Sequence, residues 1–169
     1  MRSILSTILS FGLAACVANS SSSNQRARSE SVASAAPASR FDLMIGQLAN
    51  LQGEFTPEWD FSGDNTILRR IGALSDSGAL ADTAVTHLAE CIGRTELAHA
   101  TFRGRRIPLG VVCYAALAHL AYHEEADSTG HLTPYWAGFI NTPETTPEQL
   151  AAAQQAWLKA AREGSYHTL

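Results

Sequence analysis

The sequence predicts an all-α fold, a compact helical domain that carries one short β-hairpin insert. Apolar residues recur at helical spacing in several segments of residues 41–169. Capping residues, Pro and Gly bound these segments. The stretch RTELAHATFRGRRIPLG breaks the helical pattern, and its residues 98–102 and 105–109 are expected to pair across Arg103-Gly104.

Two helices are expected in the first half of this domain. FDLMIGQLANL has helical spacing and ends near Gly53, and NTILRRIGAL follows Asp64 or Asn65 as a cap. The stretch between them, GEFTPEWDFSGDN, has the Pro and Gly content of a structured loop. The apolar positions of the two helices are Phe41, Met44, Ile45, Leu48 and Leu51, then Ile67, Leu68, Ile71 and Leu74.

Three further helices are expected. ALADTAVTHLAECIG forms an apolar stripe and ends at Gly93, which fits the C′ position. After Pro108, VVCYAALAHLAYHEEA is apolar nearly all round until Glu124, which predicts a central buried helix. A loop with several aromatic residues follows, and Thr146, Pro147 and Gln149 then begin a last helix that closes at Gly164.

The amino-terminal stretch MRSILSTILSFGLAAC has the length of a signal-peptide hydrophobic region and is too short for a membrane span. Leu13, Ala14, Ala15 and Cys16 resemble the lipobox of bacterial lipoproteins. The resemblance implies that residues 1–15 are removed, that Cys16 carries lipid, and that the chain is held at a membrane. Because Val17 is not aspartate, it also implies an outer-membrane lipoprotein facing the periplasm. The alternative is a general secretory signal with a chance cysteine.

Residues 16–40 are rich in Ser, Ala and Asn and contain no aromatic residue, so we expect a lipidated cysteine followed by a flexible tether. The domain proper is expected at residues 41–169. With Cys16 lipidated, Cys91 and Cys113 remain as a pair in an oxidising compartment, which favours a disulfide. Two buried free thiols are the alternative.

The order of helix, Arg-rich hairpin and cysteine-bearing helix at residues 80–124 resembles a unit of uncharacterised bacterial secreted proteins related to HEAT-like repeats. The resemblance covers one unit only, and no second copy is evident in the sequence. It implies HEAT-like helix pairs and a binding scaffold, and it implies no particular chemistry.

The best candidate for a metal site lies in the stretch HLAYHE. His119 and His123 are four residues apart, so they would be neighbours on one helix face, and Glu124 follows. Such a pair can bind zinc or copper, with His99 or His131 as a third ligand. The alternative is two histidines at the edge of a buried helix. We expect no other cofactor, because the sequence contains no phosphate-cradling glycine loop or nucleophile motif.

Two groups of residues are candidates for binding a partner. Arginine presents a planar fork suited to carboxylate and phosphate, and aromatic residues dominate interface hot spots. The alternatives are a solvated turn for the arginines and lids over the core for the aromatic side chains. The candidates are Arg94, Arg103, Arg105 and Arg106 around the hairpin, Trp59 and Phe61 in the first loop, and Trp136 in the second.

The formal net charge of −4 predicts no nucleic-acid partner, because phosphate neutralisation needs a basic face. The sequence thus favours a non-catalytic envelope lipoprotein that binds a protein or cell-wall component in the periplasm. An inhibitor or immunity protein of a periplasmic hydrolase is one version of this role. The alternative is a metal-dependent periplasmic hydrolase that uses His119, His123 and Glu124.

Overall fold

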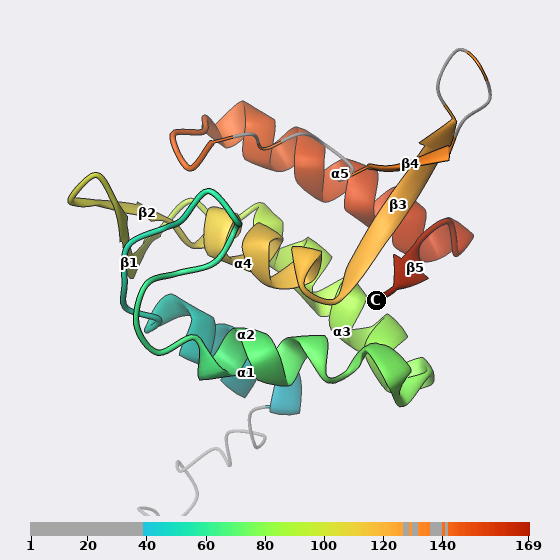
Figure 1. The fold of residues 1–169 in the computed structure, drawn as a ribbon, viewed down its shortest axis with the longest axis horizontal. Helices are drawn as coiled ribbons and strands as arrows, with labels where there is room; N and C mark the ends of the chain where they lie inside the picture. Colours follow the sequence, from blue (N-terminus) through green and yellow to red (C-terminus); the bar gives the residue numbers. More distant parts are fainter. Residues whose placement is uncertain (1–38, 127–128, 130–131, 136–139, 141) are drawn as a thin grey trace, which may run out of the picture. The chain divides into compact units, whose positions relative to one another are not determined.

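The computed structural model describes residues 39–126, 129, 132–135, 140 and 142–169 (Figure 1). This part of the chain is mostly helical and also contains two small antiparallel sheets. None of its helices is long and apolar enough to cross a lipid bilayer. The helices are α1 (Arg40–Ala49), α2 (Thr66–Gly72), α3 (Ala79–Ile92), α4 (Leu109–Ala118) and α5 (Pro147–Glu163), with a 3-10 turn at Ser75–Ser77. The strands are β1 (Leu97–Phe102), β2 (Arg105–Pro108), β3 (Ala121–Ala126), β4 (Leu132–Tyr135) and β5 (His167–Thr168).

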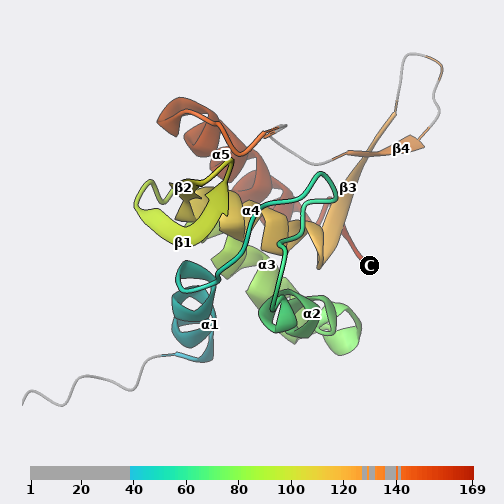
Figure 2. The same cartoon turned by 60° about the vertical axis from the view of Figure 1, so that its left-hand side comes forward.

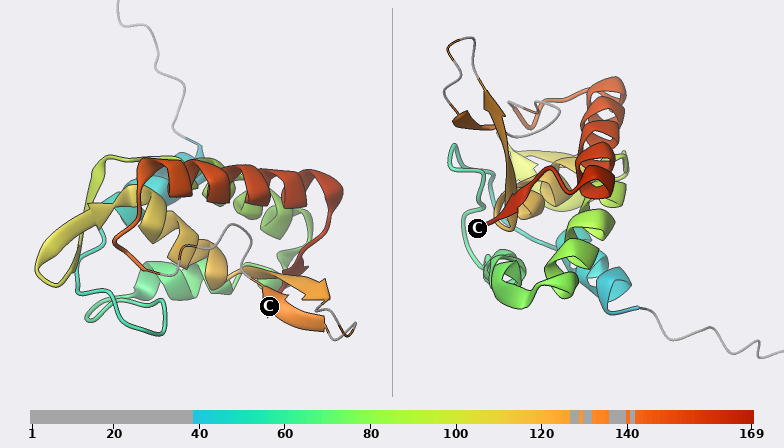
Figure 3. Two further views of the ribbon diagram at one scale, coloured as in Figure 1. Left: turned by 90° about the horizontal axis from the view of Figure 1, so that it is seen from above. Right: turned by 90° about the vertical axis from the view of Figure 1, so that its right-hand side faces the viewer.

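Helix α4 forms the centre of the domain. Its sequence contains no charged residue, and every side chain from Leu109 to Leu117 is buried, as the all-round apolar pattern predicts. It packs against α3, α1 and α2, while α5 packs against α3. Figure 3 (right) accordingly shows α5 on one side of α3 and α4, and α1 and α2 on the other.

The helix predicted to continue to Glu124 ends earlier. Helix α4 ends at Ala118, His119 is its C-cap residue, and β3 begins at Ala121. Strand β3 pairs with β4 on one side and with β5 on the other. Strand β4 is the next segment of the chain, whereas β5 comes from a distant one, and pairing on both edges of β3 overrides local helical preference. The predicted all-α fold with a single hairpin therefore misses a second sheet, including β4 within the stretch predicted as a loop.

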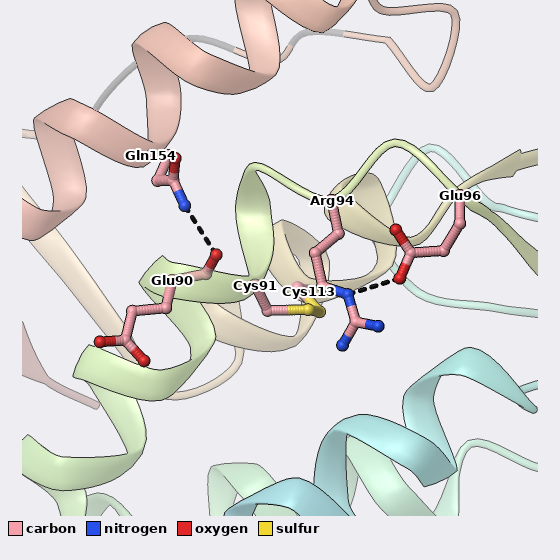
Figure 4. The surroundings of a disulfide bond; sticks show 6 residues. All are labelled: Glu90, Cys91, Arg94, Glu96, Cys113 and Gln154. Carbon is pink, nitrogen blue, oxygen red and sulfur yellow. Dashed lines mark hydrogen bonds and ion pairs between the residues drawn. A yellow bond between two sulfur atoms is a disulfide. The ribbon is translucent and has the colours of Figure 1, made fainter.

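The predicted disulfide between Cys91 and Cys113 is confirmed. Cys91 lies at the end of α3 and Cys113 within α4, with their Cα atoms 5.9 Å apart (Figure 4). The predicted hairpin is also confirmed as β1 and β2, which return the chain so that α4 starts where α3 ends. The Gly110 N–H donates to the Arg94 carbonyl at 2.9 Å, which locks this crossing next to the disulfide.

Gly93 does not take the left-handed C′ role predicted for it. Its φ is −70°, in the right-handed region. The Gln154 amide of α5 instead donates to the Glu90 carbonyl at 2.7 Å (Figure 4). A Cβ atom on Gly93 would lie 2.5 Å from the Gln154 Oε1 atom. A larger residue at position 93 would therefore have to displace the Gln154 side chain that caps α3.

The last residues of the chain are attached to α3 through a tyrosine. The Tyr166 hydroxyl donates to Asp82 Oδ1. Burial, together with this carboxylate, raises the pKa of Tyr166 to about 12. The folded state therefore favours the protonated phenol, whereas an unfolded tyrosine ionises near its usual pKa of 10.0.

We expect the stability contributed by Tyr166 to be complete below pH 10 and to be lost between pH 10 and about 12. Tyr166→Phe should lower the free energy of unfolding at pH 8 by about 1 kcal/mol, through loss of the hydrogen bond. The same variant should show a weaker fall in stability above pH 10. Urea unfolding of the two proteins at pH 8, 10 and 11 measures this. Tyr122→Phe is the control that retains the steep alkaline fall, and an unchanged pH profile in Tyr166→Phe would contradict the assignment.

Candidate functional site

The loop of residues 53–64, here called the aromatic loop, joins the β1–β2 hairpin through backbone hydrogen bonds. The Phe55 N–H donates to the Thr101 carbonyl at 2.8 Å, and the Thr101 N–H donates to the Gly53 carbonyl at 2.9 Å. Glu54 and Thr101 therefore form a parallel bridge, and the start of the loop acts as a further strand beside β1 (Figure 1). The two regions that sequence patterns identified separately are one structural unit.

Glu54 reinforces this junction through its side chain. Its carboxylate accepts a hydrogen bond from Thr101 Oγ1 at 2.7 Å and another from the Arg103 backbone N–H. The Thr101 hydrogen bond, followed by the backbone N–H of Arg103, holds the pKa of Glu54 below its usual value. The ionised form of Glu54 therefore secures the aromatic loop to the turn of the hairpin.

The aromatic loop contains a tight turn of its own. Phe55 and Phe61 form an antiparallel bridge, and the Thr56 N–H donates to the Asp60 carbonyl at 2.9 Å. Closing this turn places Trp59 in the left-handed region, with φ of 59°. That conformation is uncommon for a bulky residue and costs free energy.

The two aromatic residues predicted to bind a partner have different environments. Phe61 is 3% exposed and contacts the Phe55 ring, with centroids 5.4 Å apart, so it belongs to the hydrophobic core. Trp59 is half-buried and contacts Phe55 and Tyr114, with centroid distances of 5.1 and 5.2 Å. Of this pair, only Trp59 presents surface to a partner. The third aromatic candidate, Trp136, lies outside the described residues.

Two of the four candidate arginines are engaged within the domain. Arg106 donates from Nε to the Ala98 carbonyl at 2.6 Å and from Nη2 to the Leu97 carbonyl at 2.7 Å. The β1–β2 register shifts between Leu97 and Thr101, so Arg106 satisfies carbonyl groups in the irregular part of β1. Arg94 forms an ion pair with Glu96 (Figure 4). These roles are structural, although both side chains reach the surface.

The other two arginines occupy the turn. Arg103 has φ of 50° and Gly104 has φ of 72°, as a two-residue hairpin turn of the primed type requires. The Arg103 guanidinium lies 4.9 Å from the centroid of the Phe102 ring and 3.8 Å from Glu144 Oε1. Arg105 is exposed and forms no ion pair with any residue that the structure describes.

Trp59, Phe102, Arg103 and Arg105 together form a surface that we call the hairpin edge. Phe55 links it from beneath, since its ring contacts both Trp59 and Phe102, the latter at 6.2 Å. Within the described part of the chain, Trp59 and Arg103 are the two non-glycine residues with positive φ. Sequence reasoning missed Phe102, although its position directly before the Arg103-Gly104 turn was a usable signal.

The structure removes the basis of the predicted metal site. His119 caps α4 and His123 lies in β3, so they are not neighbours on one helix face. His99 is exposed on β1, and His131 lies outside the described residues. Among the residues that the structure places, no three His, Cys, Asp or Glu side chains are arranged to hold a metal ion. The predicted metal-dependent hydrolase required His119 and His123 on one helix face next to Glu124, and the described residues do not have this arrangement.

Comparison of the chain with protein-family models, with curated proteins and with solved structures found no match. The functional argument therefore rests on the residues of the hairpin edge and on the amino-terminal sequence.

Proposed function

We propose that this protein is an outer-membrane lipoprotein of the bacterial envelope whose helical domain binds another envelope component in the periplasm, without catalysis. The observation that carries the binding role is the conformation of Trp59 and Arg103. Both are non-glycine residues held at positive φ, at the tips of two turns joined by backbone hydrogen bonds. Strained residues cluster at functional sites, because the rest of the fold must offset their cost.

The chemistry of the hairpin edge suits a partner with an apolar group beside an anionic one. The partly exposed Trp59 and Phe102 rings offer apolar area with few rotatable bonds, which favours interface hot spots. Arg105 offers a guanidinium whose donors have no carboxylate partner within the described residues. An inhibitor or immunity protein of a periplasmic hydrolase remains a version of this proposal. The HEAT-like resemblance of residues 80–124 supports a binding scaffold in the same way.

The anchor is a separate part of the proposal and rests on the sequence Leu13-Ala14-Ala15-Cys16. We expect cells expressing the full chain to incorporate labelled palmitate into it, and Cys16→Ala to abolish the label. Globomycin should cause the unprocessed precursor to accumulate. Palmitate incorporation that persists in Cys16→Ala would overturn the assignment of the lipid to this cysteine.

The binding role is tested by affinity capture of the full chain from its native envelope. We expect Trp59→Ala to reduce recovery of the partner by at least tenfold, because truncating a central aromatic anchor costs about 2 kcal/mol. Arg105→Gln should reduce recovery less, and more strongly at low salt, since exposed charges are screened. Arg162→Gln, an exposed arginine on α5, is the matched control.

Thermal unfolding of each variant separates loss of binding from loss of fold. Equal recovery with the parent, Trp59→Ala and Arg105→Gln would contradict the role of the hairpin edge. If the inhibitor version is right, the captured partner is a hydrolase, and adding the parent protein lowers its rate, whereas adding Trp59→Ala does not.

A further inference from the structure

A groove between α1 and α2 contains two cavities that share lining residues. The larger has a volume of about 650 Å³ and extends to the aromatic loop, and the smaller has a volume of about 230 Å³. Gln47, Ile67 and Arg70 line both cavities, so the two are adjacent. Residues of α1 and α2 line both cavities. Figure 2 shows the ribbons of these two helices below α4. The combined size is within the range of ligand sites in proteins.

The larger cavity offers unused hydrogen-bonding groups. The side-chain amides of Gln47 and Gln52 are exposed and form no hydrogen bond with another described residue. Two other polar side chains of this cavity hold the local structure, because Asn50 donates to the Gly46 carbonyl and Ser62 accepts from the Glu54 N–H. An amide side chain both donates and accepts, so Gln47 and Gln52 match the backbone groups of an extended peptide.

Six of the nine residues that line the smaller cavity are apolar, and the other three are Arg40, Gln47 and Arg70. Met44 and Ile71 are buried at its base, and Ile67 and Leu74 are partly exposed. Leu43 is 60% exposed, which leaves a large apolar side chain in water at the rim. A cavity of this size and composition accepts an apolar side chain of a partner.

The charged side chains that line the groove favour an anionic ligand. Arg40 and Arg70 are exposed, line the groove, and form no ion pair with any described residue. Asp64 is the one carboxylate among the described lining residues, and it already accepts from the Thr66 N–H and hydroxyl. A groove with unpaired arginines in a chain of net charge −4 is complementary to a carboxylate.

We propose that this groove binds an extended peptide segment of a partner protein, with an acidic residue two positions from an apolar one. Side chains two residues apart point to the same face of an extended chain. The apolar side chain enters the smaller cavity, and the carboxylate pairs with Arg70, where the cavities meet. Residues 17–39 of this chain are a poor occupant, because they carry Arg26 and Arg28 against a single acid, Glu30. This site goes beyond the proposed function and does not depend on the hairpin edge.

The test titrates the ¹⁵N-labelled full chain with acetyl-Ala-Leu-Ala-Glu-Ala-amide and with its glutamine counterpart, monitored by NMR. We expect saturable shifts of the backbone amides of Gln47, Ile67 and Arg70, with the glutamate peptide binding about tenfold more tightly. Arg70→Gln should abolish this preference. Arg69→Gln is the matched control and should preserve it, because Arg69 bonds to Asn65 and Thr66 and lines neither cavity.

Several outcomes would overturn the proposal. These are equal affinity for the two peptides, no shifts in the groove, or groove shifts produced by phosphatidylglycerol vesicles and not by the peptides, which would assign the groove to lipid. If Arg70→Gln unfolds, Leu43→Ser at the exposed rim is expected to weaken the glutamate peptide severalfold, and unchanged affinity would overturn the proposal. Trp59→Ala should leave peptide binding unchanged, so failure of the groove and failure of the hairpin edge are distinguishable.

Discussion

Replacing Cys91 and Cys113 together by alanine is expected to lower the free energy of unfolding by about 3 kcal/mol. The disulfide closes a loop of sequence separation 22, and the chain-entropy model gives a stabilisation of this size for such a loop. Both sulfurs are buried between α3 and α4, so their loss also removes packing at the centre of the domain. The melting temperature should fall by about 10 °C. Urea unfolding and thermal scans of the full chain measure the two quantities.

Reductant provides the control for this prediction. Dithiothreitol should destabilise the parent protein by a similar amount and leave the double variant unchanged, because the variant has no bridge to reduce. Destabilisation of both proteins by dithiothreitol would show that the effect does not come from the Cys91–Cys113 bond.

Gly110→Ala is expected to lower the free energy of unfolding by about 3 kcal/mol. A Cβ atom at Gly110 would overlap the Ile92 carbonyl oxygen and lie 2.9 Å from the Arg94 carbonyl oxygen. Both obstacles are backbone atoms at the end of α3, and they cannot move aside as a flexible side chain could. The substitution must therefore separate α3 from α4 beside the disulfide, which is the cost of overpacking a close crossing.

Gly46→Ala is the matched control for that substitution. Gly46 lies in the middle of α1, is exposed, and has nothing within 4 Å of a Cβ position. Alanine is the better helix former, so this change should raise the free energy of unfolding by about 0.5 to 1 kcal/mol. Comparable destabilisation by the two glycine replacements would contradict the close approach at Gly110.

Local sequence patterns predicted the structure correctly where the residues that determine it lie within a few positions of one another. Thr146 and Gln149 form the expected capping box of α5, and the helix closes at Gly164 as expected, where φ is 64°. The β1–β2 hairpin follows from Arg103-Gly104, because a two-residue turn restricts the strands that flank it. Side-chain periodicity and turn chemistry act over a few residues, so a sequence read alone contains them.

The candidate site was only partly accessible in this way. Trp59, Arg103 and Arg105 were identifiable by residue type. The sequence left open whether Phe61 binds a partner or covers the core, and it did not indicate the internal role of Arg106. Arg106 bonds to the Leu97 and Ala98 carbonyls because the strand register shifts there, and no local pattern reports that shift. Whether an arginine stays in solvent or bonds within the domain depends on which nearby backbone groups lack a hydrogen-bond partner.

By itself the sequence determined where helices occur, the capping box of the last helix, the hairpin, and the lipobox pattern that predicts a location, and it favoured the pairing of Cys91 with Cys113. The tertiary structure alone decided that residues 121–126 form a strand, that the aromatic loop joins the hairpin, and that α1 and α2 enclose a groove. The physical reason is the range of the interactions. Caps and turns are satisfied within a few residues, whereas Ala121 and Tyr122 of β3 pair with residues 167–168, and the Phe55 N–H donates to the Thr101 carbonyl. Contacts of that separation form only when the whole chain has folded.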